Sequence, residues 1–111
     1  MLQTNIKLTA GDSKRIVIGV TDNQGHQINI TNATGKFTIG KVSQPSPEQI
    51  ILQKNVGILD GPSGYVEVVL LPEDTAGISG IFMYDIELTY QDGFVETVVT
   101  GRVEILGDIT P

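Results

Sequence analysis

Apolar and polar residues alternate along most of the chain, which is the pattern of β-strands that bury one face. The clearest run spans residues 14–21, where Ile16, Ile18 and Val20 share one side. Runs of the same period also span residues 4–9, 28–30, 33–41, 66–70, 81–90 and 94–105. Residues 50–59 are apolar with weaker alternation, so we expect one strand with a bulge, or two short strands.

Turn residues separate these runs, as the short connections of an antiparallel sheet require. They lie at Gly11-Asp12, Asp22 to Gly25, Gly61 to Gly64 and Asp92-Gly93. Residues 43–49 contain two prolines and no periodicity, which predicts a loop.

The chain has one helical signal, which begins at Leu71 and ends at Gly77. Pro72 suits the first helical position, and the two acidic residues after it favour the positive end of the helix dipole. Gly77 suits the left-handed conformation that ends a helix. We therefore expect a single helical turn near residues 72–76.

The last two strands form a hairpin whose register is predictable. A two-residue turn at Asp92-Gly93 of type I′ places all the apolar faces on one side. The two residue numbers of each cross-strand pair then add to 185. Tyr84 therefore lies opposite Gly101 and covers the backbone that glycine leaves bare.

A three-residue loop is the alternative for this hairpin. If the strands pair without interruption, this loop sets Tyr90 opposite Phe94 and buries Glu96 opposite Leu88. Because a slip of one residue moves every side chain to the other face, we expect the two-residue turn.

The composition agrees with strands rather than helices. The chain has 14 Ile, 11 Val and 11 Thr but only three Ala. β-branched side chains fit a pleated strand and lose rotamer freedom in a helix. We expect an all-β fold, an antiparallel sandwich of seven or eight short strands.

Length and charge exclude several classes of protein. The 111 residues suit one domain, so we assign residues 1–111 to a single β-sandwich. The longest apolar run is four residues, from Val68 to Leu71, and the N-terminus lacks the apolar core of a signal peptide. The net charge of −6 argues against a nucleic-acid partner. We expect no membrane partner.

Catalytic and metal-binding patterns are missing from the sequence. His26 is the single histidine and lies beside a turn, where we interpret it as a solvated turn residue. One histidine without any cysteine cannot complete a zinc site, and no glycine-rich phosphate loop follows a strand. We expect no enzyme activity and no cofactor.

Six aspartates fall at turns or strand ends, where they hydrogen-bond their own backbone. They are Asp12, Asp22, Asp60, Asp74, Asp92 and Asp108. A calcium site at converging loops is the alternative, but no EF-hand or repeat spacing supports it. The sequons at Asn29 and Asn32 are interpreted as chance in an Asn/Thr-rich turn.

Several of these pieces occur together, in order, in one known family. They are Gly11-Asp12, Ile16–Val20, Thr21–Gly25, Ile28–Thr34 leading into Phe37–Ile39, Gly64–Val68, Leu71–Gly77, Tyr84–Leu88 and Thr97–Gly101. The order resembles the immunoglobulin-like β-sandwich modules of tailed bacteriophages, and is similar to the N-terminal domain of phage baseplate upper proteins. The resemblance covers about residues 11–106.

The resemblance implies a virion structural protein of the tail or baseplate, made in the bacterial cytoplasm and linking to receptor-binding parts. It implies no catalytic residues. Its expected partners are other phage structural proteins and further copies of the chain, as a homo-oligomer. Baseplate upper proteins continue into a helical stalk whereas this chain ends at Pro111, so we expect a truncated piece or a stand-alone accessory protein. The alternative is a bacterial surface-exposed immunoglobulin-like binding or adhesion module, with carbohydrate as one ligand class.

The outer face of the last hairpin supplies a candidate protein interface. The predicted register pairs Ile81 with Glu104, Met83 with Arg102 and Glu87 with Val98. An apolar centre with a charged rim is typical of protein interfaces. The candidate interface residues are Ile81, Met83, Val98, Arg102 and Glu104. Tyr65 and Val69 lie on the outer face of their own strand, which need not belong to the same sheet.

Overall fold

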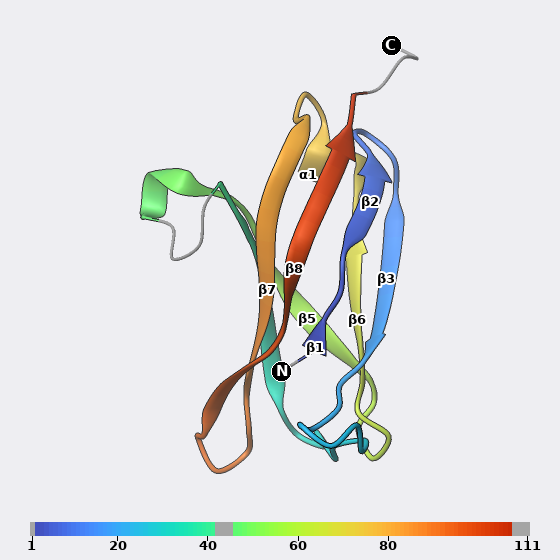
Figure 1. Ribbon diagram of the computed structural model, residues 1–111, viewed down its shortest axis with the longest axis vertical. Coiled ribbons are helices and arrows are strands. Elements are labelled where there is room, and N and C mark those ends of the chain that lie inside the picture. Colours follow the sequence, from blue (N-terminus) through green and yellow to red (C-terminus); the bar gives the residue numbers. More distant parts are fainter. Residues whose placement is uncertain (1, 42–45, 108–111) are drawn as a thin grey trace.

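The computed structural model describes residues 2–41 and 46–107, and most of them lie in strands (Figure 1). The strands are β1 (Leu2–Gln3), β2 (Ile6–Thr9), β3 (Lys14–Gly19), β4 (Thr34–Gly40), β5 (Ile50–Asp60), β6 (Tyr65–Leu70), β7 (Gly80–Thr89) and β8 (Val95–Leu106). The helical segments are the 3₁₀ turn η1 (Pro47–Gln49) and the single turn α1 (Pro72–Thr75). The all-β class and the helical turn near 72–76 are confirmed.

The strands form one sheet that curls over on itself, rather than two separate sheets. Its order is β1-β8-β7-β4-β5-β6-β3, with β2 also on β8. Strand β5 joins the two halves, because residues 50–56 pair with β4 and residues 57–60 pair with β6. All pairings are antiparallel except those of β1 and β2, which run parallel to β8.

The core lies between the two halves of the curled sheet. Alternate residues of each strand point inward, as the period-2 pattern predicts. The largest fully buried side chains include Phe37, Ile39, Ile86 and Leu88 from one half and Val66, Val68 and Leu70 from the other. The rings of Phe37 and Tyr84 pack with their centroids 5.4 Å apart.

Two segments differ from the predicted elements. Residues 28–30 form no strand, yet Ile30 is fully buried and its N–H donates to the carbonyl of Gly61 at 2.8 Å. In the predicted loop 43–49, η1 occupies residues 47–49, and residues 43–45 lie outside the described chain.

The β7–β8 hairpin follows the predicted register over most of its length. The pairs from Gly80 with Ile105 to Ile86 with Val99 all sum to 185, including Tyr84 with Gly101. Beyond Ile86 the register shifts by one residue. The hairpin closes through a three-residue loop, with the N–H of Tyr90 donating to the carbonyl of Phe94 at 2.8 Å. The predicted two-residue turn is therefore wrong.

A β-bulge at Val98 separates the predicted register, up to Ile86 with Val99, from the shifted register nearer the loop. The inserted residue places Val98 and Val99 side by side on the buried face. Glu96 does lie opposite Leu88, but it stays exposed near the end of the hairpin. Its carboxylate accepts a hydrogen bond from the Tyr90 hydroxyl at 3.0 Å. The loop needs a positive φ only at Gly93, where φ is 90°.

Gly101 lies at the crowded point where β1, β7 and β8 meet. The Tyr84 hydroxyl donates to the Thr4 carbonyl at 2.7 Å, across Gly101. Burial raises the pKa of Tyr84 to about 12, so the hydroxyl keeps the proton it donates. A Cβ on Gly101 would overlap the Thr4 carbonyl and crowd the Tyr84 ring. Only glycine therefore fits beside the N-terminal segment.

Gly101→Ala should lower the free energy of unfolding by about 1–3 kcal/mol, because overpacking forces the backbone apart. Urea unfolding followed by circular dichroism measures the change. Gly57→Ala is the matched control, because a Cβ on this β5 residue meets only the Glu67 carbonyl, at 3.6 Å. Equal effects of the two substitutions would contradict the packing at Gly101.

Candidate functional site

Apolar side chains gather on the outer face of the hairpin where β7 begins and β8 ends. Ile81 is 63% exposed, the largest exposed fraction among the exposed large hydrophobic residues of the described chain. Leu106 is 42% exposed and lies diagonally across the strand pair from Ile81, and Met83 is half-buried on the same face. Diagonal neighbours of this kind lie within reach of long side chains.

Charged residues surround this apolar centre. Arg102 lies opposite Met83, and Glu104 lies opposite Ile81. Strand β2 adds Lys7, which is paired in register with Glu104. We define the hairpin patch as Ile81, Met83, Arg102, Glu104, Leu106 and Lys7.

A shallow groove of about 280 Å³ runs along the border between the hairpin patch and β2. Asn5 lines this groove and is joined to β8, because its side-chain oxygen accepts a hydrogen bond from the backbone N–H of Arg102 at 3.1 Å. Within the described chain, neither Arg102 nor Glu104 forms an ion pair with another side chain. Both charges are therefore available to a partner. The lining residues are Asn5, Ile6, Lys7, Ile81, Arg102 and Glu104.

The hairpin patch ends along β7 at Asp85 and Glu87. Burial raises the pKa of the Asp85 carboxyl, and the nearby charge of Glu87 raises it further. Asp85 lies between Thr38 on β4 and Thr100 on β8. This stretch of the outer face is polar, so it bounds the hairpin patch along β7.

The structure brings together four of the five predicted interface residues. Ile81, Met83, Arg102 and Glu104 share the outer face, as predicted. Val98 does not belong to it, because the bulge turns its side chain into the core, where it is 3% exposed. Its assignment to the interface is wrong.

Three further residues of this surface were missed by the sequence reasoning. Leu106 could have been found, since it lies two residues beyond Glu104 in the predicted register. Asn5 and Lys7 could not, because they reach the site through parallel pairing of β2 with β8, nearly the whole chain apart.

The predicted outer-face residues Tyr65 and Val69 lie on β6, in the other half of the sheet. There they are joined by Val17 of β3, which is 47% exposed. The Nε atom of Arg15 lies 3.5 Å from the Glu67 carboxylate within this face. This second surface is separate from the hairpin patch.

His26 is a turn residue, as interpreted from the sequence. Its side chain is 73% exposed, and its Nδ1 lies 3.7 Å from the Asp22 carboxylate. The same carboxylate accepts the backbone N–H groups of His26 and Gln24. These bonds, that of His26 first, lower the pKa of Asp22. Asp22 therefore stabilises its own turn.

Two further aspartates also accept hydrogen bonds from local backbone, whereas Asp12 accepts none in the described chain. Asp60 accepts the N–H of Ser63, and Asp92 accepts that of Phe94. Asp108 lies outside the described residues. Over residues 2–41 and 46–107, no three His, Asp or Glu side chains are grouped to hold a metal ion. No helix in the described part of the chain is long and apolar enough to cross a membrane.

Comparisons with known proteins add little to this site. No protein-family model and no curated protein matches the chain. Among solved structures, a 2,6-sialyltransferase from Photobacterium sp. JT-ISH-224 is 10% identical, with a TM-score of 0.39 over 96% of this chain and 18% of that one. A family 123 glycoside hydrolase from Clostridium perfringens is 13% identical, with a TM-score of 0.40 over 100% of this chain and 24% of that one. The chain thus spans under a quarter of either enzyme, and likenesses this weak say nothing of its activity.

Asp74 gives the fold a predictable acid sensitivity. Its carboxylate lies 2.6 Å from Nζ of Lys54 on β5 and also accepts the N–H of Leu71. The bond from Lys54 is the main cause of its lowered pKa. A lowered pKa in the folded protein means that the stabilisation is present above the unfolded value and is lost as pH falls through the folded value.

Asp74→Asn should therefore lower the free energy of unfolding by about 1–3 kcal/mol at pH 7, and the deficit should shrink towards zero in acid. Urea unfolding at several pH values measures the gap between variant and parent. Asp12→Asn is the control, because that exposed carboxylate forms no side-chain hydrogen bond in the described chain. A deficit that stays constant with pH would contradict the assigned role of the Lys54 pair.

Proposed function

We propose that this chain is a non-enzymatic module that docks onto other proteins through the hairpin patch, as a structural part of a bacteriophage tail or baseplate. The observation that carries the docking proposal is the apolar centre of Ile81, Met83 and Leu106, ringed by Lys7, Arg102 and Glu104. Protein interfaces have this arrangement of an apolar centre inside a polar rim.

The tail or baseplate assignment rests on the sequence resemblance alone. It implies a location in the virion and other structural proteins of the phage as partners. Neighbouring genes test it directly: tail or baseplate genes on either side would support a virion protein. A secretion leader or a sortase signal would favour the alternative, a bacterial surface adhesion module.

A second copy of the chain is the partner that the charges favour. Arg102 and Glu104 lie two residues apart on one strand and carry opposite signs. In a two-fold symmetric interface the same surface meets itself, so Arg102 of one copy can approach Glu104 of the other. The patch is thus complementary to itself in both charge and apolarity.

Self-association through the patch should be lost in the double variant Ile81→Lys, Met83→Asp, because each change places a charge in the apolar centre. Light scattering with size-exclusion chromatography measures the mass. Val17→Lys is the matched control, since Val17 is an exposed apolar residue on the other half of the sheet and should leave the mass unchanged.

A charge exchange sharpens the test. Arg102→Glu alone and Glu104→Arg alone each place like charges together across a two-fold axis and should weaken association, whereas the two together should restore it. If the parent self-associates and neither the apolar double variant nor the single exchanges change its mass, the patch is ordinary surface and docking occurs elsewhere.

A further inference from the structure

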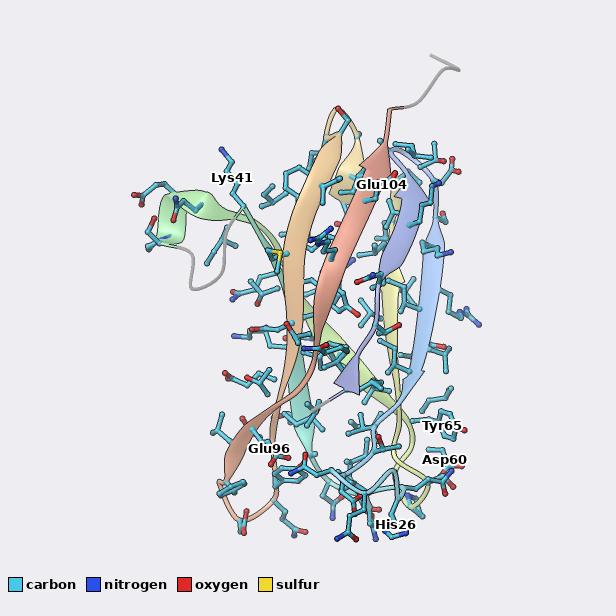
Figure 2. The ribbon with its side chains drawn as sticks, in the orientation of Figure 1. His26, Lys41, Asp60, Tyr65, Glu96 and Glu104 are labelled. Carbon is cyan, nitrogen blue, oxygen red and sulfur yellow. The ribbon has the colours of Figure 1, made fainter. Side chains whose placement is uncertain are left out.

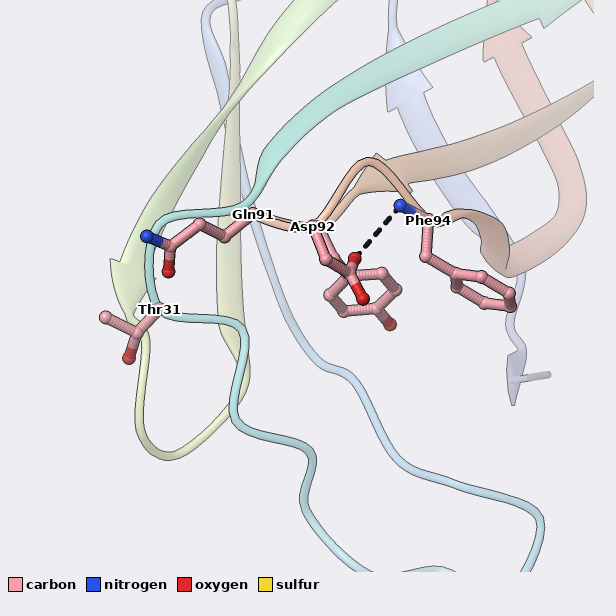
Figure 3. A pocket seen from close by; sticks show the side chains of 5 residues that line it. Thr31, Gln91, Asp92 and Phe94 are labelled. Carbon is pink, nitrogen blue, oxygen red and sulfur yellow. Dashed lines mark hydrogen bonds between the residues drawn. The ribbon is translucent and has the colours of Figure 1, made fainter.

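The hairpin has a second hollow at its other end, beside the β7–β8 loop (Figure 3). Figure 2 shows the separation: Glu104 lies near one end of the molecule, whereas Glu96 and His26 lie near the other. The hollow measures about 360 Å³ and is open to solvent. Its lining residues are Thr31, Tyr90, Gln91, Asp92 and Phe94.

Two aromatic rings form one wall of this hollow. The shifted register places Tyr90 directly opposite Phe94, with their ring centroids 6.1 Å apart and their planes 35° from each other. Tyr90 packs partly on the core, but Phe94 is 60% exposed. An aromatic ring this exposed offers a flat apolar surface to a ligand.

The opposite side of the hollow is formed by Thr31, from the loop before β4, and by Gln91. Thr31 and Gln91 lie on one side of the hollow and Phe94 on the other, with Asp92 between them (Figure 3). The Asn32 side chain donates to Oε1 of Gln91 at 3.3 Å, which links this loop to the hairpin. The loop before β4 is therefore fixed to the hairpin by a direct hydrogen bond.

Several polar atoms around the hollow retain unused hydrogen-bonding capacity. Gln91 accepts through Oε1, so its amide N–H groups remain as donors. Asp92 uses Oδ1 to accept the N–H of Phe94, and Oδ2 remains as an acceptor. The hydroxyls of Tyr90 and Thr31 each donate to a neighbour and can still accept.

These features fit a neutral sugar. A pyranose ring has an apolar C–H face that stacks on an aromatic ring, and a rim of hydroxyls that both donate and accept. The carboxylate of Asp92, with that of Glu96 on the Tyr90 hydroxyl, disfavours anionic ligands, and none of the five lining residues is basic. A purely apolar ligand would leave these polar groups unpaired.

We propose that the hollow beside the β7–β8 loop is a binding site for a neutral saccharide. The sugar ring stacks on Phe94, Oδ2 of Asp92 accepts from its hydroxyls, and the Gln91 amide donates to a ring or hydroxyl oxygen. The site is distinct from the hairpin patch and does not depend on the proposed docking function. Because the hollow is shallow and open, we expect dissociation constants on the order of 1 mM.

Titrations of the ¹⁵N-labelled chain with lactose, maltotriose and chitotriose, each to ~20 mM, test the proposal by amide chemical shifts. We expect at least one of these neutral sugars to shift the amides of residues 31 and 90–94 and to leave those of the hairpin patch in place. Glucuronic acid should bind at least about tenfold more weakly. Absence of saturable shifts with all three neutral sugars, or equal binding of glucuronic acid, would overturn the proposal.

Phe94→Ala should weaken the binding of the responding sugar by about tenfold or more, because it removes the stacking surface. Val95→Ala is the matched control: Val95 is 52% exposed and adjacent, but points to the opposite face of the hairpin. Asp92→Asn keeps an oxygen for the Phe94 N–H and should weaken binding without unfolding the loop. Equal losses in Phe94→Ala and Val95→Ala would overturn the site.

The double variant Ile81→Lys, Met83→Asp separates this site from the hairpin patch. It should bind the sugar as the parent does, even where it no longer self-associates. Loss of sugar binding in this variant, with its other amide shifts unchanged, would place the saccharide at the hairpin patch and overturn the assignment to the Phe94 hollow.

Discussion

The extra residue in β8 at Val98 is the constraint on which both candidate sites depend. Side chains alternate along a strand, so one inserted residue exchanges the faces of everything on one side of it. Towards Gly80 the unshifted register turns Ile81 and Arg102 outward. Towards the loop the shifted register sets Tyr90 against Phe94 at the end of the core. Without the bulge, only one of the two surfaces would exist in its present form.

The bulge changes which residues of β8 face the core. In an unbroken register Val95 and Thr97 would face inward, and Val98 would face water. With the bulge Val98 joins the core at 3% exposure and Val95 is left 52% exposed, so one valine replaces the other in the core. The bulge also places Thr97 on the outer face, opposite Glu87, so its hydroxyl is not buried in the core. The three-residue loop also needs a left-handed conformation only at Gly93, which glycine adopts without strain.

The alternating pattern predicted the strands and most of the hairpin because it reports a local requirement, one buried face per strand. It could not place the bulge, since Val95, Val98 and Val99 supply apolar residues to either register. The parallel pairing of β2 was also invisible, because no local pattern states that Lys7 will lie beside Glu104. On β7 and β8 the sequence therefore predicted Ile81, Met83, Arg102 and Glu104 but misplaced Val98 and overlooked Leu106, and it missed the residues that reach the patch from β2.

Strand β8 runs from one candidate site to the other. Phe94 and Glu104 are ten residues apart in sequence, about 30 Å of extended chain. Strand β8 is paired with β7 along its length, and with β1 and β2 at residues 99–100 and 103–106. A protein at the hairpin patch and a saccharide at Phe94 would not collide, and neither would need the sheet to move. If both proposals hold, the hairpin would carry a protein partner and a saccharide at opposite ends, which suits a module that connects a protein assembly to a glycan.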